Sequence, residues 1–136
     1  MWIQCNPNPL KKEVPDCVIR AISIALNKNW YDVYDDVCRI GRNECNMPSS
    51  DSVWGRYLYQ CGFEPFLLPE SCPRCTTVST FSQLFPEGTY IIGTGHHAVT
   101  IIDGNYYDSW DSGNEVPSFF WKIGTLKELN GNAELL

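Results

Sequence analysis

The fold is decided by the stretch GHHAVTIIDGNYYDSW, residues 95–110. An apolar, β-branched run from Ala98 to Ile102 is followed by Asp-Gly and then by a second run rich in tyrosine. Asp-Gly between two such runs is the strongest short-range signal of a β-hairpin with a two-residue turn. We therefore predict a hairpin that turns at Asp103 and Gly104.

This hairpin places an imidazole and a carboxylate on one surface. Side chains alternate between the two faces of a strand, so His97 shares a face with Asp108 and is its diagonal neighbour, with Trp110 beside them. Sliding the turn by one residue keeps this parity, and only an odd-length loop or a bulge breaks it. His96 falls on the opposite face, and we therefore prefer His97 as the functional histidine.

Length and composition restrict the class of protein. The 136 residues suffice for one domain, 1–136, and the 43% hydrophobic content suffices for a core. A net charge of −6 argues against a nucleic-acid backbone as the main partner. No apolar run approaches the length of a membrane span and no secretion leader is visible, so we expect a cytoplasmic protein, most simply a monomer.

The chain contains seven cysteines, a high count for its length. An odd number without a secretion signal argues against a disulfide framework and favours free thiols in a reducing compartment. The seven are Cys5, Cys17, Cys38, Cys45, Cys61, Cys72 and Cys75.

One of these thiols lies where its chemistry is favoured. Apolar residues at helical spacing predict a helix that Asp16 caps and that runs to Leu26. Cys17 is then in the first turn, where free N–H groups and the helix dipole stabilise a thiolate. The alternative is an ordinary half-buried cysteine on a capped helix.

The remaining chain predicts an α+β fold, with N-terminal helices packed on a small C-terminal antiparallel sheet. The proline-punctuated first ten residues are expected to be extended across the surface. Further helices are expected over 29–41, 51–61 and 77–85, and further strands over 63–68, 89–93 and 118–123.

Together, Cys17, His97 and Asp108 supply the three parts of a nucleophilic triad. The thiol would be the nucleophile, the imidazole its base, and the carboxylate the group that orients the ring. The simpler alternative is a capped helix with a buried cysteine and an unrelated polar hairpin.

The order of these motifs resembles that of the papain-like cysteine peptidases. His97-Ala98-Val99 resembles the superfamily's histidine segment, and Asp108-Ser109-Trp110 resembles its Asn-Ser-Trp segment, with Asp in place of Asn. The run DCVIRAI, residues 16–22, is similar to the Cys-Leu-Phe-Arg-Ala run of the OTU-type deubiquitinating branch. Short phage and bacterial proteins of this layout are similar too.

The resemblance covers residues 16–26 and 89–112, and it implies a papain-like fold. It implies a thiol hydrolase that cleaves a peptide or isopeptide bond of a protein or peptide through an acyl-thioester, without a cofactor. The implied roles are nucleophile for Cys17, base for His97 and orienting group for Asp108.

The sequence also departs from these families. Val14-Pro15 replaces the glycine-rich run of the OTU branch, and lysines occupy the region of the papain-type glutamine. The oxyanion donors are therefore expected to be the Cys17 N–H and an upstream side chain, of which we favour Asn6 and Gln4. Trp110 is a candidate for the wall of a substrate groove.

Two alternatives remain open. Cys72 and Cys75 have the spacing of half a zinc knuckle, which Cys38, Cys45 or His96 would have to complete. A loop disulfide is a further possibility, but two free thiols are favoured. The alternative function is a non-catalytic binding or inhibitor module on the same fold, stabilised by zinc in one version.

Overall fold

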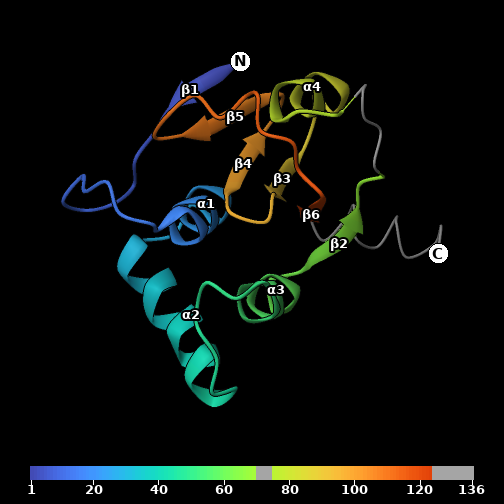
Figure 1. Ribbon diagram of the computed structural model, residues 1–136. Helices are drawn as coiled ribbons and strands as arrows, with labels where there is room; N and C mark the ends of the chain where they lie inside the picture. Colours follow the sequence, from blue (N-terminus) through green and yellow to red (C-terminus); the bar gives the residue numbers. More distant parts are fainter. Residues whose placement is uncertain (70–74, 124–136) are drawn as a thin grey trace.

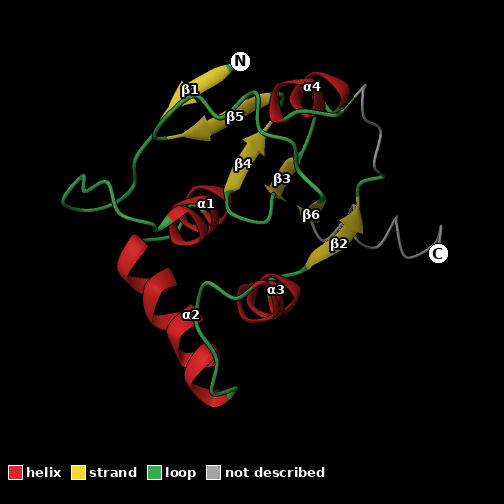
Figure 2. Cartoon of the chain, viewed as in Figure 1, coloured by secondary structure: helices red, strands yellow, loops and turns green. Residues whose placement is uncertain are grey.

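The computed structural model describes residues 1–69 and 75–123, and within these ranges the fold is α+β (Figure 2). The described chain forms four helices and one mixed sheet of six strands. The helices are α1 (Cys17–Leu26), α2 (Trp30–Asn43), α3 (Asp51–Gln60) and α4 (Val78–Leu84). The strands are β1 (Trp2–Gln4), β2 (Phe63–Leu67), β3 (Thr89–Gly93), β4 (Ala98–Ile102), β5 (Asn105–Asp108) and β6 (Phe119–Ile123).

The predicted hairpin is the centre of the sheet, whose strand order is β1-β5-β4-β3-β6-β2. Ile102 pairs with Asn105, so the turn consists of Asp103 and Gly104, as predicted. Both turn residues have positive φ, 48° and 80°, as a type I′ turn requires. Since the strands are antiparallel, the start of β4 and the end of β5 lie at the same end of the sheet.

The prediction of a purely antiparallel sheet is wrong at one edge. Residues Trp2–Gln4, expected only to be extended, form β1 and pair in parallel with β5 (Figure 1). The Asp108 carbonyl accepts from the Trp2 indole at 3.2 Å and from the Cys5 N–H at 2.9 Å. The short segment therefore satisfies the open edge of β5, which no local sequence signal requires.

The two faces of the sheet bury separate apolar clusters. One cluster joins α1, α2 and α3 to the sheet through Ile91 and Ala98. The other joins α4 to the opposite face through Tyr90, Ile92 and Val99. In Figure 1, α4 lies apart from the other three helices. The hydroxyl of buried Thr100 on β4 donates to the Ala21 carbonyl of α1, which fixes that helix against the central strand.

Two residues expected to mark the ends of helices, Asp16 and Gly41, have other roles in the structure. Asp16 precedes α1, but its side chain makes no capping hydrogen bond. Gly41 was expected to end the second helix, yet α2 continues to Asn43. A Cβ at Gly41 would lie 2.8 Å from the Asn46 carbonyl oxygen, so glycine is needed there for close approach of the following loop. Asn29 does cap α2, accepting from the Tyr31 N–H at 2.7 Å.

The cysteines correct another expectation. Cys5, Cys17, Cys38, Cys45 and Cys61 are free. Cys75, however, is disulfide-bonded, so the prediction of a free thiol there is wrong. An odd number of cysteines requires at least one free thiol, but it does not prevent two of the others from forming a disulfide. Cys72 lies outside the described residues.

A disulfide sulfur has no thiolate to offer a metal, which removes Cys75 from the proposed zinc ligands. Among residues 1–69 and 75–123, no cluster of three or more His, Cys, Asp or Glu side chains could hold a metal ion. In the same part of the chain, every helix is too short or too polar to cross a membrane.

The packing of α4 generates a stability prediction. Phe81 is fully buried and contacts the rings of Tyr90 and Phe120, whereas Leu84 on the same helix is 62% exposed. Phe81→Ala should lower the free energy of unfolding by about 3–5 kcal/mol, because it leaves a cavity under the helix. Leu84→Ala should change it by less than about 0.5 kcal/mol. Urea denaturation of both variants measures the difference, and equal losses would contradict the assigned orientation of α4.

Candidate active site

Cys17 is the first residue of α1 and is half-buried. The N–H groups of a helix's first turn have no intrahelical acceptor, so the thiol lies beside unpaired donors and the positive end of the dipole. The carboxylate of neighbouring Asp16 is turned to other partners, the guanidinium of Arg20, the Asn8 amide and the Trp30 indole.

His97 immediately precedes β4, and its ring lies between two of the predicted partners. Its Nε2 is 2.5 Å from Oδ2 of Asp108. The Cys17 thiol acts on the same ring and helps to raise its pKa, and Nδ1 is the ring nitrogen that Asp108 leaves open to it. Trp110 packs against the ring with centroids 4.9 Å apart. The structure thus brings Cys17, His97 and Asp108 together, as the hairpin parity predicts for the last two.

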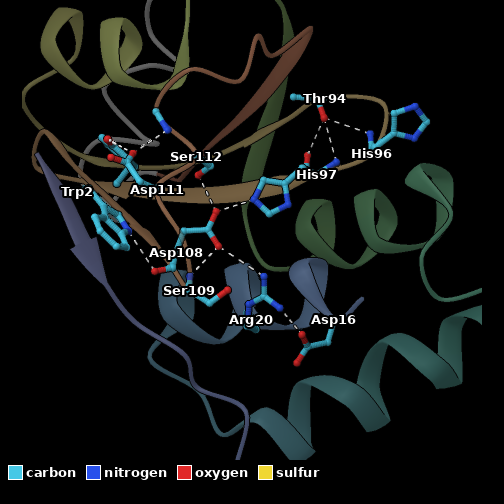
Figure 3. Close-up of polar contacts among 12 residues, drawn as sticks. Trp2, Asp16, Arg20, Thr94, His96, His97, Asp108, Ser109, Asp111 and Ser112 are labelled. Atoms are coloured by element: carbon cyan, nitrogen blue, oxygen red, sulfur yellow. Dashed lines mark hydrogen bonds and ion pairs between the residues drawn. The ribbon is translucent and has the colours of Figure 1, made fainter. Parts of the chain in front are cut away.

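The backbone of His97 is held by a closed turn. The hydroxyl of Thr94 accepts from the N–H groups of His96 and His97, at 3.1 and 2.9 Å. The Thr94 N–H donates to the His97 carbonyl at 2.8 Å. In Figure 3 the two histidine rings point to different sides of this turn, with only His97 directed at Asp108. His96 is exposed, and its ring is directed away from Asp108.

The Asp108 carboxylate is buried and receives four donors (Figure 3). Oδ2 accepts from His97 and from the Ser112 hydroxyl, the latter at 2.6 Å. Oδ1 accepts from the Ser109 N–H at 2.8 Å and faces the Arg20 guanidinium at 3.5 Å. A carboxylate has about four acceptor positions, so this one is fully used and its orientation is fixed.

These contacts shift three pKa values in a consistent pattern. Burial by itself raises the pKa of Cys17, but the hydrogen bond and charge of His97, the Ala98 backbone and the Arg20 charge outweigh it and lower the pKa. Burial opposes protonation of His97, yet Asp108 and Cys17 raise its pKa to about 9. Burial of Asp108 is outweighed by His97 and Ser112, so its pKa is lowered. These contacts therefore favour the thiolate form of Cys17, the imidazolium form of His97 and the carboxylate form of Asp108.

A cleft of about 610 Å³ opens beside the thiol. The start of α1 and the turn at 94–97 form part of its wall, and Trp30 and Tyr34 of α2, stacked at 5.1 Å, form another part. Trp54 of α3 also lines it. The cleft thus joins a reactive end, at Cys17 and His97, to a mainly apolar and aromatic interior.

The proposed oxyanion and groove residues lie elsewhere. Gln4 is exposed on β1, and Asn6 uses its side-chain oxygen to accept from the Asn8 N–H at 3.1 Å. Neither side chain lines the cleft, and neither does Trp110, which covers His97 instead. Of the oxyanion donors expected from the sequence, only the backbone N–H at the start of α1 lies beside the thiol in the part of the chain that the structure describes.

Three residues that hold the triad in place were not predicted from the sequence as site residues. Thr94 carries a local signal, since Thr before Gly commonly forms a hydroxyl-closed turn. Ser112 follows Asp108 by four residues, but nothing in its surroundings identifies its partner. Arg20 appears in the run that resembles the OTU branch, yet its contact with Asp108 spans 88 residues and depends on the tertiary fold.

The hydrogen bond between His97 and Asp108 generates a titration prediction. Asp108→Asn should lower the pKa of His97 from about 9 toward 6.5, because the carboxylate gives the largest contribution that raises it. Imidazole ¹⁵N NMR shifts, followed from pH 5 to 11, measure the change. An unchanged His97 curve would contradict the assigned pair.

Comparison of the chain with known protein families, with curated proteins and with solved structures finds no match.

Proposed function

We propose that the protein is a cysteine hydrolase that cleaves a peptide, isopeptide or related amide bond on a papain-like fold. The observation that carries this proposal is the His97 ring, held between the Asp108 carboxylate and the Cys17 thiol at the start of a helix. The adjoining cleft supplies room for an acyl group at the nucleophile.

Acylation follows from the charges of the triad. The Cys17 thiolate adds to the substrate carbonyl carbon, and the oxygen of the carbonyl takes the negative charge. The N–H groups at the start of α1 are the donors available for that oxyanion. The tetrahedral species collapses as the His97 imidazolium gives its proton to the leaving amine, which departs and leaves a thioester on Cys17.

Deacylation reverses the role of the imidazole. Neutral His97 accepts a proton from water as the oxygen of that water adds to the thioester carbonyl. The carboxylic acid leaves, and Cys17 departs as the thiolate beside a regenerated imidazolium. Asp108 holds the ring through Nε2, so the same nitrogen faces sulfur throughout, and no cofactor is needed for either half of the reaction.

The cleft supports a protein or peptide substrate with apolar or aromatic groups near the scissile bond. Its wall combines the Trp30–Tyr34 stack with Trp54 and with proline and valine side chains before the nucleophile. A non-catalytic binding module would use the same apolar surface but has no need of a thiol with a lowered pKa.

The first test compares the reactivity of two thiols. Cys17 should react with iodoacetamide at pH 5–7 at least about tenfold faster than exposed Cys45, because its pKa is lowered. His97→Ala should remove this advantage, since the imidazole is the largest influence that lowers the pKa of Cys17. Peptide mapping by mass spectrometry gives both rates in one sample. Equal rates in the wild-type protein would favour the binding-module alternative.

The second test is turnover of a library of fluorogenic peptide amides. Cys17→Ala and His97→Ala should reduce turnover by on the order of 10⁴-fold, and Asp108→Ala by less, because an imidazole remains beside the thiol although its orientation and its raised pKa are lost. The pH profile should be bell-shaped. Activity rises through the lowered pKa of Cys17 and falls near pH 9 as His97 loses the proton it must donate. Full turnover in Cys17→Ala would exclude the mechanism.

A further inference from the structure

A row of buried charges leads from the triad carboxylate of Asp108 through Arg20 to Asp16 (Figure 3). Arg20 lies on the second turn of α1 and its side chain is 8% exposed; the side chains of Asp16 and Asp108 are 7% and 2% exposed. One amino group of the guanidinium, Nη1, contacts Oδ1 of Asp16, and the other, Nη2, faces Oδ1 of Asp108 at 3.5 Å.

This arrangement divides one cation between two anions. The contact with Asp16 is the closer, and Nη1 also reaches the Val14 carbonyl at 3.4 Å. Asp16 is itself anchored through Oδ2, which accepts from Asn8 at 3.1 Å and from the Trp30 indole at 3.0 Å. Arg20 is therefore held on the side of Asp16, and its second amino group is presented to the triad carboxylate.

The position of Arg20 has consequences for both ends of the triad. The planar guanidinium joins the helix that carries Cys17 to the strand that carries Asp108, so the spacing of nucleophile and orienting group depends on it. Its charge also adds to the contacts that lower the pKa of the Cys17 thiol, of which the hydrogen bond from His97 is the larger.

We propose that Arg20 is a positioning residue of the active site, which aligns Asp108 and stabilises the Cys17 thiolate. The negative charge of Asp16 partly offsets the charge of Arg20 and so limits its effect on both residues. Nothing in this role requires contact with substrate. The proposal rests on the proposed function, since it concerns the same triad.

The proposal predicts effects of opposite sign for two changes at adjacent positions. Asp16→Asn keeps a side-chain oxygen that can accept from Asn8 and Trp30, but it removes the negative charge that offsets Arg20. The positive charge of Arg20 then acts on the triad without this opposing charge. Cys17 alkylation at pH 6 should then become about two- to threefold faster, since the loss of the adjacent carboxylate and the unopposed positive charge of Arg20 both favour the thiolate.

The double variant Asp16→Asn/Arg20→Gln removes both charges and so leaves no unpaired buried carboxylate at position 16. Loss of the cation should move the acid limb of Cys17 alkylation to higher pH. The rate at pH 6 should therefore fall at least about twofold below that of Asp16→Asn/Arg20→Lys. Asp16→Asn/Arg20→Lys, which restores a cation, should recover most of this loss. Both double variants carry Asp16→Asn, so the difference between them reports the charge at position 20 alone, and a merely structural role predicts equal rates in the two.

The matched control is Glu44→Gln/Arg56→Gln, which also removes one ion pair and leaves the net charge unchanged. Arg56 is 61% exposed and its pair lies on the surface between α2 and α3, so the Cys17 profile should stay within twofold of wild type. Circular dichroism checks that each variant is folded. If Asp16→Asn/Arg20→Gln does not fold, Asp16→Asn/Arg20→Met, which keeps a long unbranched side chain without the charge, replaces it.

The outcomes separate this inference from the proposed function. Wild-type Cys17 that reacts no faster than Cys45 would overturn the proposed function itself. Fast wild-type alkylation, with equal rates in the two double variants, would overturn the positioning role alone. Slower alkylation in Asp16→Asn would likewise contradict it, because the Arg20 charge would then not act on the thiolate as described.

Discussion

The structure depends on the two-residue turn between β4 and β5. Positive φ at Asp103 and Gly104 closes the hairpin with Ile102 opposite Asn105, and this register fixes which side chains reach the end of the sheet. A shift of one residue would place every side chain of β5 on the other face. The meeting of His97 and Asp108, only 11 residues apart, is therefore a direct result of the turn.

The third member of the triad comes from a different layer. Helix α1 is held on β4 by the apolar residues of its inner face and by the hydrogen bond from Thr100 to Ala21. This packing brings the start of α1 to the end of the sheet where His97 and Asp108 lie. The hairpin thus provides base and orienting group, and helix packing delivers the nucleophile to them.

The features that the sequence predicted are those with local causes. The hairpin, its turn and the three long helices follow from periodicity and from residues such as Asn29 and Gly104. The parallel strand β1 was missed because its partner lies about a hundred residues away, at Tyr106–Asp108. Asp16 is expected from the sequence to cap α1, but its carboxylate pairs with the guanidinium of Arg20 and not with a backbone N–H. Because this pair is buried by the tertiary fold, the local sequence does not reveal it. Gly41 looked like a helix end because its actual constraint, the carbonyl of Asn46, is tertiary.

The pairing of β1 with β5 bears on the order in which the molecule is assembled. The first strand has no partner until residues 105–108 are present, and the thiol at position 17 has no imidazole until residue 97 has been added. Contacts of such long sequence separation form late, because loop closure must precede them. During synthesis, Cys17 therefore remains an ordinary thiol without its activating partner, and its reactivity is acquired together with the native fold.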